Sequence, residues 1–97
     1  MSTYILLGTY TEQGIRGIKD TVKRTEAVKE LAKKAGLTMK ESYWTLGQYD
    51  VVAVFDAPDD NTMTAFALSV AKLGNVKTQT LRAFSGKEMT SVIGKLV

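Results

Sequence analysis

The chain has 97 residues, a net charge of +3, 44% hydrophobic residues and neither cysteine nor histidine. Without cysteine there are no disulfides and no thiolate nucleophiles, and without either residue the usual ligands of zinc, copper and haem are missing. The length fits one small domain, residues 1–97. The apolar run at residues 4–7 follows no basic segment and is too short to span a membrane. We therefore expect one cytoplasmic domain that makes no membrane contact.

The first half of the chain predicts a strand, a helix and a second strand. Residues 3–10 are rich in β-branched and aromatic side chains, which is typical of a strand, and residues 11–14 predict a loop. Apolar residues recur at helical spacing over residues 18–35, and Gly36 follows as a helix-ending residue. Residues 37–46 predict the second strand.

The second half predicts a hairpin partner, another helix and a last strand. Gly47 and Gln48 predict a tight turn, so residues 49–57 should pair antiparallel with the second strand. The remaining elements are a helix opened by residues 57–61 and ended by Gly74, a strand over residues 76–84, and a short amphipathic tail with a capping box at residues 85–88.

This order of elements is that of the ferredoxin-like, or split βαβ, fold. We predict an α+β domain with a four-stranded antiparallel sheet, the first and third strands in its centre, and two helices on one face of the sheet.

The predicted central strands carry apolar residues on both faces. In the first strand, Tyr4 and Leu6 share one face, and Ile5 and Leu7 share the other. In the third strand, one face carries Val51, Ala53 and Phe55, and the other carries Val52 and Val54. Two helices can cover only one of these faces, and soluble monomers rarely leave a contiguous apolar patch in water. A second copy of the chain, packed sheet on sheet, would cover this patch. The alternative is that the C-terminal tail folds over it.

Five side chains are the candidates for a ligand site at the end of the sheet: Tyr49, Asp50, Trp44, Gln13 and Arg82. Tyr49 could donate a hydrogen bond, Asp50 could accept one or act as a base, and Trp44 could form an apolar wall. Gln13 could anchor a polar group from a loop that closes as a lid, and Arg82 could bind a carboxylate. Structural roles are the alternative: Asp50 as a turn stabiliser, Tyr49 and Trp44 as packing residues, and Arg82 as an exposed or ion-paired residue.

Three other residues near the sheet ends are weaker candidates for the same site. Tyr10 and Tyr43 could line an apolar pocket, and Arg24 could anchor a polar group. The acidic cluster Asp56, Asp59 and Asp60 could suggest a hard cation, but helix capping explains Asp59 and Asp60 without a metal. We expect no metal and no cofactor.

RNA-recognition domains share this order of elements. Their third strand requires a basic residue and stacking aromatic residues. Residues 49–55 here contain an aspartate and four aliphatic residues between Tyr49 and Phe55, and no basic residue. We therefore expect no nucleic-acid partner.

The sequence resembles the GYD-domain family through Gly47, Gln48, Tyr49 and Asp50, supported by residues 12–15, 57–60, 73–76 and 80–84. The resemblance covers nearly the whole chain. It implies a ferredoxin-like domain related to dimeric α/β-barrel proteins, and it implies no particular activity. Proteins related by fold include cofactor-free monooxygenases, decarboxylases and ligand-binding modules.

Two functions follow as hypotheses. The first is a homo-oligomeric module that binds a small apolar or aromatic molecule in a sheet-lined cavity. The second is a cofactor-free enzyme of the dimeric α/β-barrel type, whose acid–base groups would have to be Tyr, Asp, Glu or Lys.

Overall fold

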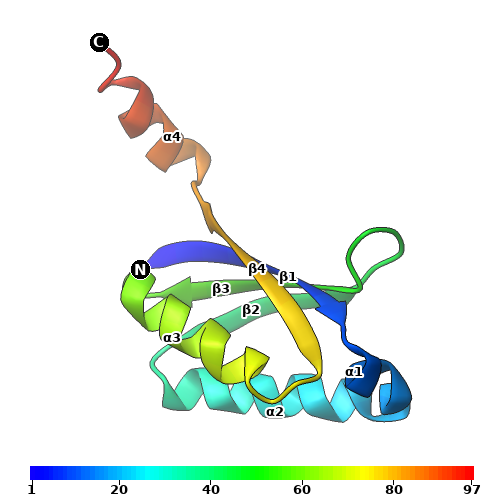
Figure 1. Cartoon of the computed structure of the whole chain (residues 1–97). Coiled ribbons are helices and arrows are strands. Elements are labelled where there is room, and N and C mark those ends of the chain that lie inside the picture. Colours follow the sequence, from blue (N-terminus) through cyan, green and yellow to red (C-terminus); the bar gives the residue numbers. More distant parts are fainter.

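The protein, described by a computed structural model over all 97 residues, is a twisted sheet with helices against one face (Figure 1). The elements in chain order are β1 (Ser2–Tyr10), α1 (Glu12–Arg16), the 3-10 helix η1 (Ile18–Asp20), α2 (Thr21–Lys34), β2 (Thr38–Trp44), β3 (Val51–Ala57), α3 (Asp60–Ala71), β4 (Val76–Ala83) and α4 (Gly86–Ile93).

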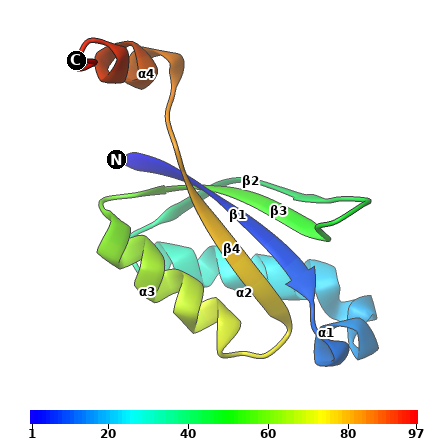
Figure 2. The ribbon, with the colours of Figure 1, turned by 45° about the horizontal axis from the view of Figure 1, so that its top comes forward.

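The sheet has the strand order β2-β3-β1-β4, and every neighbouring pair is antiparallel. The first and third strands are therefore central, and α2 and α3 lie together on one face (Figures 1 and 2). This arrangement confirms the predicted ferredoxin-like fold. The edge strand β2 carries a bulge, since its register with β3 shifts between Met39 and Glu41.

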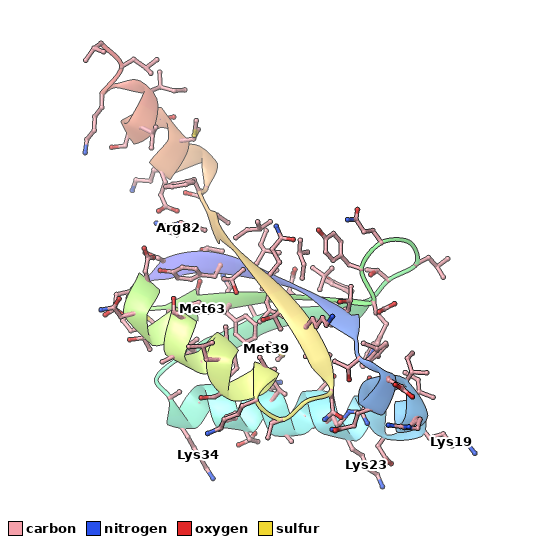
Figure 3. The ribbon with its side chains drawn as sticks, viewed as in Figure 1. Lys19, Lys23, Lys34, Met39, Met63 and Arg82 are labelled. Carbon is pink, nitrogen blue, oxygen red and sulfur yellow. The ribbon has the colours of Figure 1, made fainter.

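The core lies between the sheet and the two long helices. Alternate residues of the central strands point into it, among them Tyr4, Leu6 and Phe55. Phe55 is 1% exposed and meets the ring of Phe66 from α3 edge to face, with 5.2 Å between ring centroids. Met63 fills the space beside them, between α3 and the sheet (Figure 3). Burial of these large side chains is what holds the helices to the sheet.

The segment before α2 differs from the sequence prediction. A loop was expected at residues 11–14, but Thr11 caps the short helix α1 by accepting a hydrogen bond from the backbone N–H of Gly14. A separate 3-10 turn then precedes α2, which begins at Thr21 rather than at residue 18. The capping threonine followed by an acidic residue was the overlooked signal, because the two nearby glycines resembled a loop.

The start of α3 is fixed by an aspartate cap. The carboxylate of Asp59 accepts a hydrogen bond of 2.7 Å from the backbone N–H of Thr62. This bond favours the charged carboxylate, so the pKa of Asp59 is held below its ordinary value. The stabilisation it provides is therefore present above the ordinary aspartate pKa of about 4 and is lost as the pH falls through the lower folded-state value.

We expect Asp59→Ala to destabilise the protein at neutral pH and to cost progressively less as the pH falls below about 4. Urea unfolding of both proteins between neutral and acidic pH measures the difference. Asp20→Ala is the matched control, because Asp20 stands at the N-cap of α2 without a side-chain capping bond. A cost for Asp59→Ala that does not change with pH would contradict this prediction.

The C-terminal helix α4 stands clear of the rest of the molecule, on the side of the sheet opposite α2 and α3 (Figures 1 and 2). Ser85 and Glu88 form a complete capping box at its start, as predicted. Its apolar residues Met89, Val92 and Ile93 are between 40% and 55% exposed. The helix does not fold back over the sheet of its own chain.

Candidate functional site

An apolar cavity of about 380 Å³ lies between α2 and the sheet. Fourteen of its eighteen lining residues are hydrophobic, and they come from α2, all four strands and the end of α3. Along β2 the lining runs from Met39 to Trp44, which is about 17 Å of extended chain. A volume of this size is within the range of small-molecule sites in proteins. The cavity is therefore apolar, extends along β2 and is large enough for a small ligand.

One end of the cavity is polar. β1 and β2 run in the same direction and end there with Tyr10 and Trp44. The hydroxyls of Tyr10 and Thr21 lie 2.7 Å apart, and the indole N–H of Trp44 donates to the Thr21 hydroxyl at 3.1 Å. Thr21 is the first residue of α2, so this cluster joins the helix to the ends of two strands.

Arg24 adds a positive charge to the polar end. Its side chain lines the cavity and is partly buried. Nη1 donates to the carbonyl oxygen of Gly17 at 2.6 Å, and Nη2 donates to that of Gly14 at 3.2 Å. None of the ion pairs in the structure involves Arg24. The arginine thus ties α2 to α1 and keeps a positive charge with no carboxylate partner.

Tyr49 and Asp50 lie in the connection between β2 and β3, outside both strands. The expected two-residue turn is a six-residue loop over residues 45–50, in which Gly47 adopts a positive φ of 102°. Asp50 accepts a hydrogen bond of 2.9 Å from the backbone N–H of Tyr10, and its own N–H donates to Gly8. The Tyr49 hydroxyl donates to Gln79 on β4 at 2.9 Å, so Tyr49 reaches across the open face of the sheet. These contacts give both residues structural roles.

We expect Asp50→Ala to lower the free energy of unfolding by about 1–3 kcal/mol, because it leaves the Tyr10 N–H without its charged acceptor. Tyr49→Phe removes one exposed hydrogen bond and should cost about 1 kcal/mol or less. Chemical denaturation measures both values. Equal costs for the two variants would show that the Asp50 bond does not hold the loop to β1.

Gln13 holds α1 against the loop after α3. Its side-chain amide donates to the carbonyl oxygen of Leu73 at 3.1 Å and to the side chain of Asn75 at 2.9 Å. Thr11 adds a hydrogen bond to the carbonyl oxygen of Gly74 at 2.5 Å. In this structure the segment expected to act as a lid is therefore a short helix fastened by several hydrogen bonds.

Arg82 lies at the other end of the molecule, at the base of α4 (Figure 3). It pairs with Glu88 at 3.1 Å, and its guanidinium carbon stands 4.5 Å from the centre of the Phe84 ring. The backbone N–H of Ser85 and the Arg82 charge together lower the pKa of Glu88. Arg82 therefore has the ion-paired role that was given as the alternative to ligand binding.

Trp44 alone of the five main candidates lines the cavity, and the weaker candidates Tyr10, Tyr43 and Arg24 line it as well. Thr21 was missed, since the helix was predicted from residue 18 and Thr21 therefore fell inside it rather than at its start. A ligand-binding role for Tyr49, Asp50, Gln13 and Arg82 stays a prediction, and the structure does not bring these four residues into the cavity.

The face of the sheet away from α2 and α3 is open and apolar at its centre. Ile5 pairs with Val54, and Leu7 pairs with Val52, so these four residues form a contiguous patch. Leu81 on β4 extends the patch beside Ile5 and is 40% exposed. We call these five residues the open-face patch. No helix of the same chain lies over it (Figure 2), and the Tyr49 side chain crosses the face to Gln79, the β4 partner of Leu7.

Comparison with known proteins agrees with this architecture. The family model described as the GYD domain matches residues 4–93. The chain belongs to the GYD domain family. No helix of this GYD domain has the length and hydrophobicity to cross a membrane.

Two proteins of Thermus thermophilus are similar to this GYD domain. One, called "Glutamine synthetase and cystathionine beta-lyase binding protein", is 37% identical over 84 residues, which are 86% of this chain and 88% of that protein. The other is the crystal structure of TTHA0845, with a TM-score of 0.58 and 24% sequence identity over 89% of this chain and 96% of that one. The second similarity supports the fold alone.

Proposed function

We propose that this GYD domain is a self-associating protein-binding module, in which a second copy covers the open-face patch. The observation that supports it most directly is that Ile5, Leu7, Val52 and Val54 form a half-buried apolar surface over which no helix of their own chain lies. Sheet-on-sheet packing around a two-fold axis would bury the patch of each copy against that of the other. Helix α4 adds to the surface that needs a partner, since an isolated helix of eight residues is unstable in water.

A partner enzyme is supported by the similar protein from Thermus thermophilus, whose name states that it binds glutamine synthetase and cystathionine β-lyase. The test is biolayer interferometry with this GYD domain immobilised. Glutamine synthetase and cystathionine β-lyase, both from the organism that encodes this GYD domain, are supplied separately in solution. Saturable binding of either enzyme supports the proposal. Absence of binding to both enzymes at micromolar concentration contradicts the proposal that they are the partners.

Self-association has its own test. We expect light scattering to find a dimer or larger assembly of the wild type, and a monomer of Val54→Lys, because a buried unpaired ammonium would be costly at the contact. Val22→Lys is the matched control, since Val22 is 58% exposed on α2, away from the open-face patch. A monomeric wild type, or assemblies of the same size in both variants, would contradict the contact.

Binding of a small apolar or aromatic molecule is a second function, favoured by the cavity between α2 and the sheet. The sequence predicted such a site around Tyr49 and Asp50 at the end of the sheet, whereas this cavity lies on the helix side of the sheet and includes neither residue. The alternative of a cofactor-free enzyme has weaker support, because no Asp, Glu or Lys lines the cavity and Tyr10 and Tyr43 are the only candidates there for proton transfer.

A further inference from the structure

We propose that the cavity between α2 and the sheet binds a molecule with an extended apolar chain and a single carboxylate, and that Arg24 holds the carboxylate. The proposal rests on the small-molecule function described above and specifies the class of ligand. Three features support it: the position of the charge, the shape of the cavity and the hydrogen bonds still available at its polar end.

The charge of Arg24 is the first of these features. Arg24 is partly buried against an apolar cavity, and its two hydrogen bonds go to uncharged carbonyl groups. A guanidinium has five N–H donors, so donors remain for another acceptor. Charge-assisted bonds from arginine to a carboxylate are about twice as strong as neutral ones, and the fork of the guanidinium matches the two oxygens. An anion at this position would therefore gain a charge-assisted hydrogen bond from Arg24.

The neighbours of Arg24 suit a carboxylate as well. Tyr10 and Thr21 carry hydroxyls at the same end of the cavity, and a hydroxyl can reorient to donate to an incoming oxygen. No Asp or Glu lines the cavity to repel a negative charge. A cationic ligand would find no carboxylate there, and a neutral ligand would leave the arginine without a counter-charge.

The apolar part of the cavity fits a chain rather than a compact polar molecule. Away from the polar end the lining consists of aliphatic, methionine and phenylalanine side chains, including Leu31, Met39 and Phe55. Met39 points from the edge strand into the space between the sheet and the helices (Figure 3). Each methylene group of a ligand buried there adds to the affinity through the hydrophobic effect. An extended chain along the roughly 17 Å between Trp44 and Met39 would use this surface.

The chain carries its own reporter for the test. Trp44 is the only tryptophan, and it stands at the polar end of the cavity. Titration of its fluorescence with dodecanoate, dodecanol and dodecylamine compares an anion, a neutral molecule and a cation that share the same chain. We expect dodecanoate to bind at least about tenfold more tightly than dodecanol, since only the carboxylate accepts a charge-assisted hydrogen bond from Arg24. Dodecylamine should bind more weakly than dodecanol, because its ammonium group has the same charge as Arg24.

Arg24→Gln should remove the preference for dodecanoate and leave the affinity for dodecanol unchanged. Arg16→Gln is the matched control, because Arg16 is an exposed arginine of α1 paired with Glu12. If Arg24→Gln does not fold, the order of the three probes in the wild type still decides the question. Equal binding of the three probes, or a preference that survives in Arg24→Gln, would overturn the carboxylate while leaving the cavity as a site. Failure of all three probes to bind would reject the small-molecule function itself.

Discussion

Gly14→Ala should lower the free energy of unfolding by about 2–4 kcal/mol, a large fraction of the stability of a domain of this size. A Cβ atom at residue 14 would lie 2.1 Å from the carbonyl oxygen of Asn75 and 3.0 Å from its carbonyl carbon. Both are backbone atoms, so no side-chain rotation can relieve the clash. Helix α1 would have to withdraw from the loop that follows α3.

Withdrawal of α1 would break the bonds that hold it there. Thr11 would lose its backbone bond to Asn75 and its hydroxyl bond to Gly74, and Gln13 would lose its contacts with the same loop. Each such bond is worth about 1 kcal/mol. Urea denaturation followed by circular dichroism measures the loss. Gly86→Ala is the matched control, because a Cβ there meets nothing within 4 Å. Similar stability of the two variants would mean that α1 is not packed as described.

Phe55→Ala should cost about 3–5 kcal/mol, the usual range for removing a fully buried phenylalanine. Phe55 is 1% exposed, contacts Phe66 edge to face, and also forms part of the cavity wall. Its loss would remove the aromatic pair and enlarge the existing cavity. On a small domain the variant should be partly unfolded near room temperature, which near-ultraviolet circular dichroism and urea denaturation would detect.

The same substitution at Phe84 is the control for Phe55→Ala. Phe84 is 53% exposed and contacts the guanidinium of Arg82, an arrangement worth about 1 kcal/mol or less at an exposed site. We therefore expect Phe84→Ala to leave the unfolding midpoint nearly unchanged. Comparable losses from the two variants would contradict the placement of the core between the sheet and the helices.

The fold could be predicted from the sequence because its signals are local. The β-branched, aromatic and apolar runs of β1 and β3, the helical period of α2 and the acidic start of α3 each specify one element, and the order of the elements then specifies the topology. Boundaries were less accurate where two signals competed, as at Thr11, where a helix cap stands beside glycines typical of loops.

The location of the cavity could not be predicted in the same way. The polar end of the cavity is formed by residues from three elements: Tyr10, Thr21, Arg24 and Trp44. They come together because β1 and β2 finish at the same end of the sheet, beside the start of α2. The width of the space between α2 and the sheet depends on side-chain packing rather than on periodicity. The motif at residues 47–50 is the most conspicuous feature of the sequence, but its contacts stabilise the β2–β3 loop and none of its residues lines the cavity.

The bulge in β2 limits how copies of this protein can grow into larger structures. An edge strand with regular spacing is a template for another strand, and repeated pairing of that kind leads to fibres. Here the edge is interrupted between Met39 and Glu41, and two charged side chains, Lys40 and Glu41, stand at the interruption. In-plane addition of a strand at the β2 edge is thereby disfavoured, while the open face remains available. In the face-to-face pair proposed above, each copy would close the open face of the other, and the β2 edge would be a poor template for further strands.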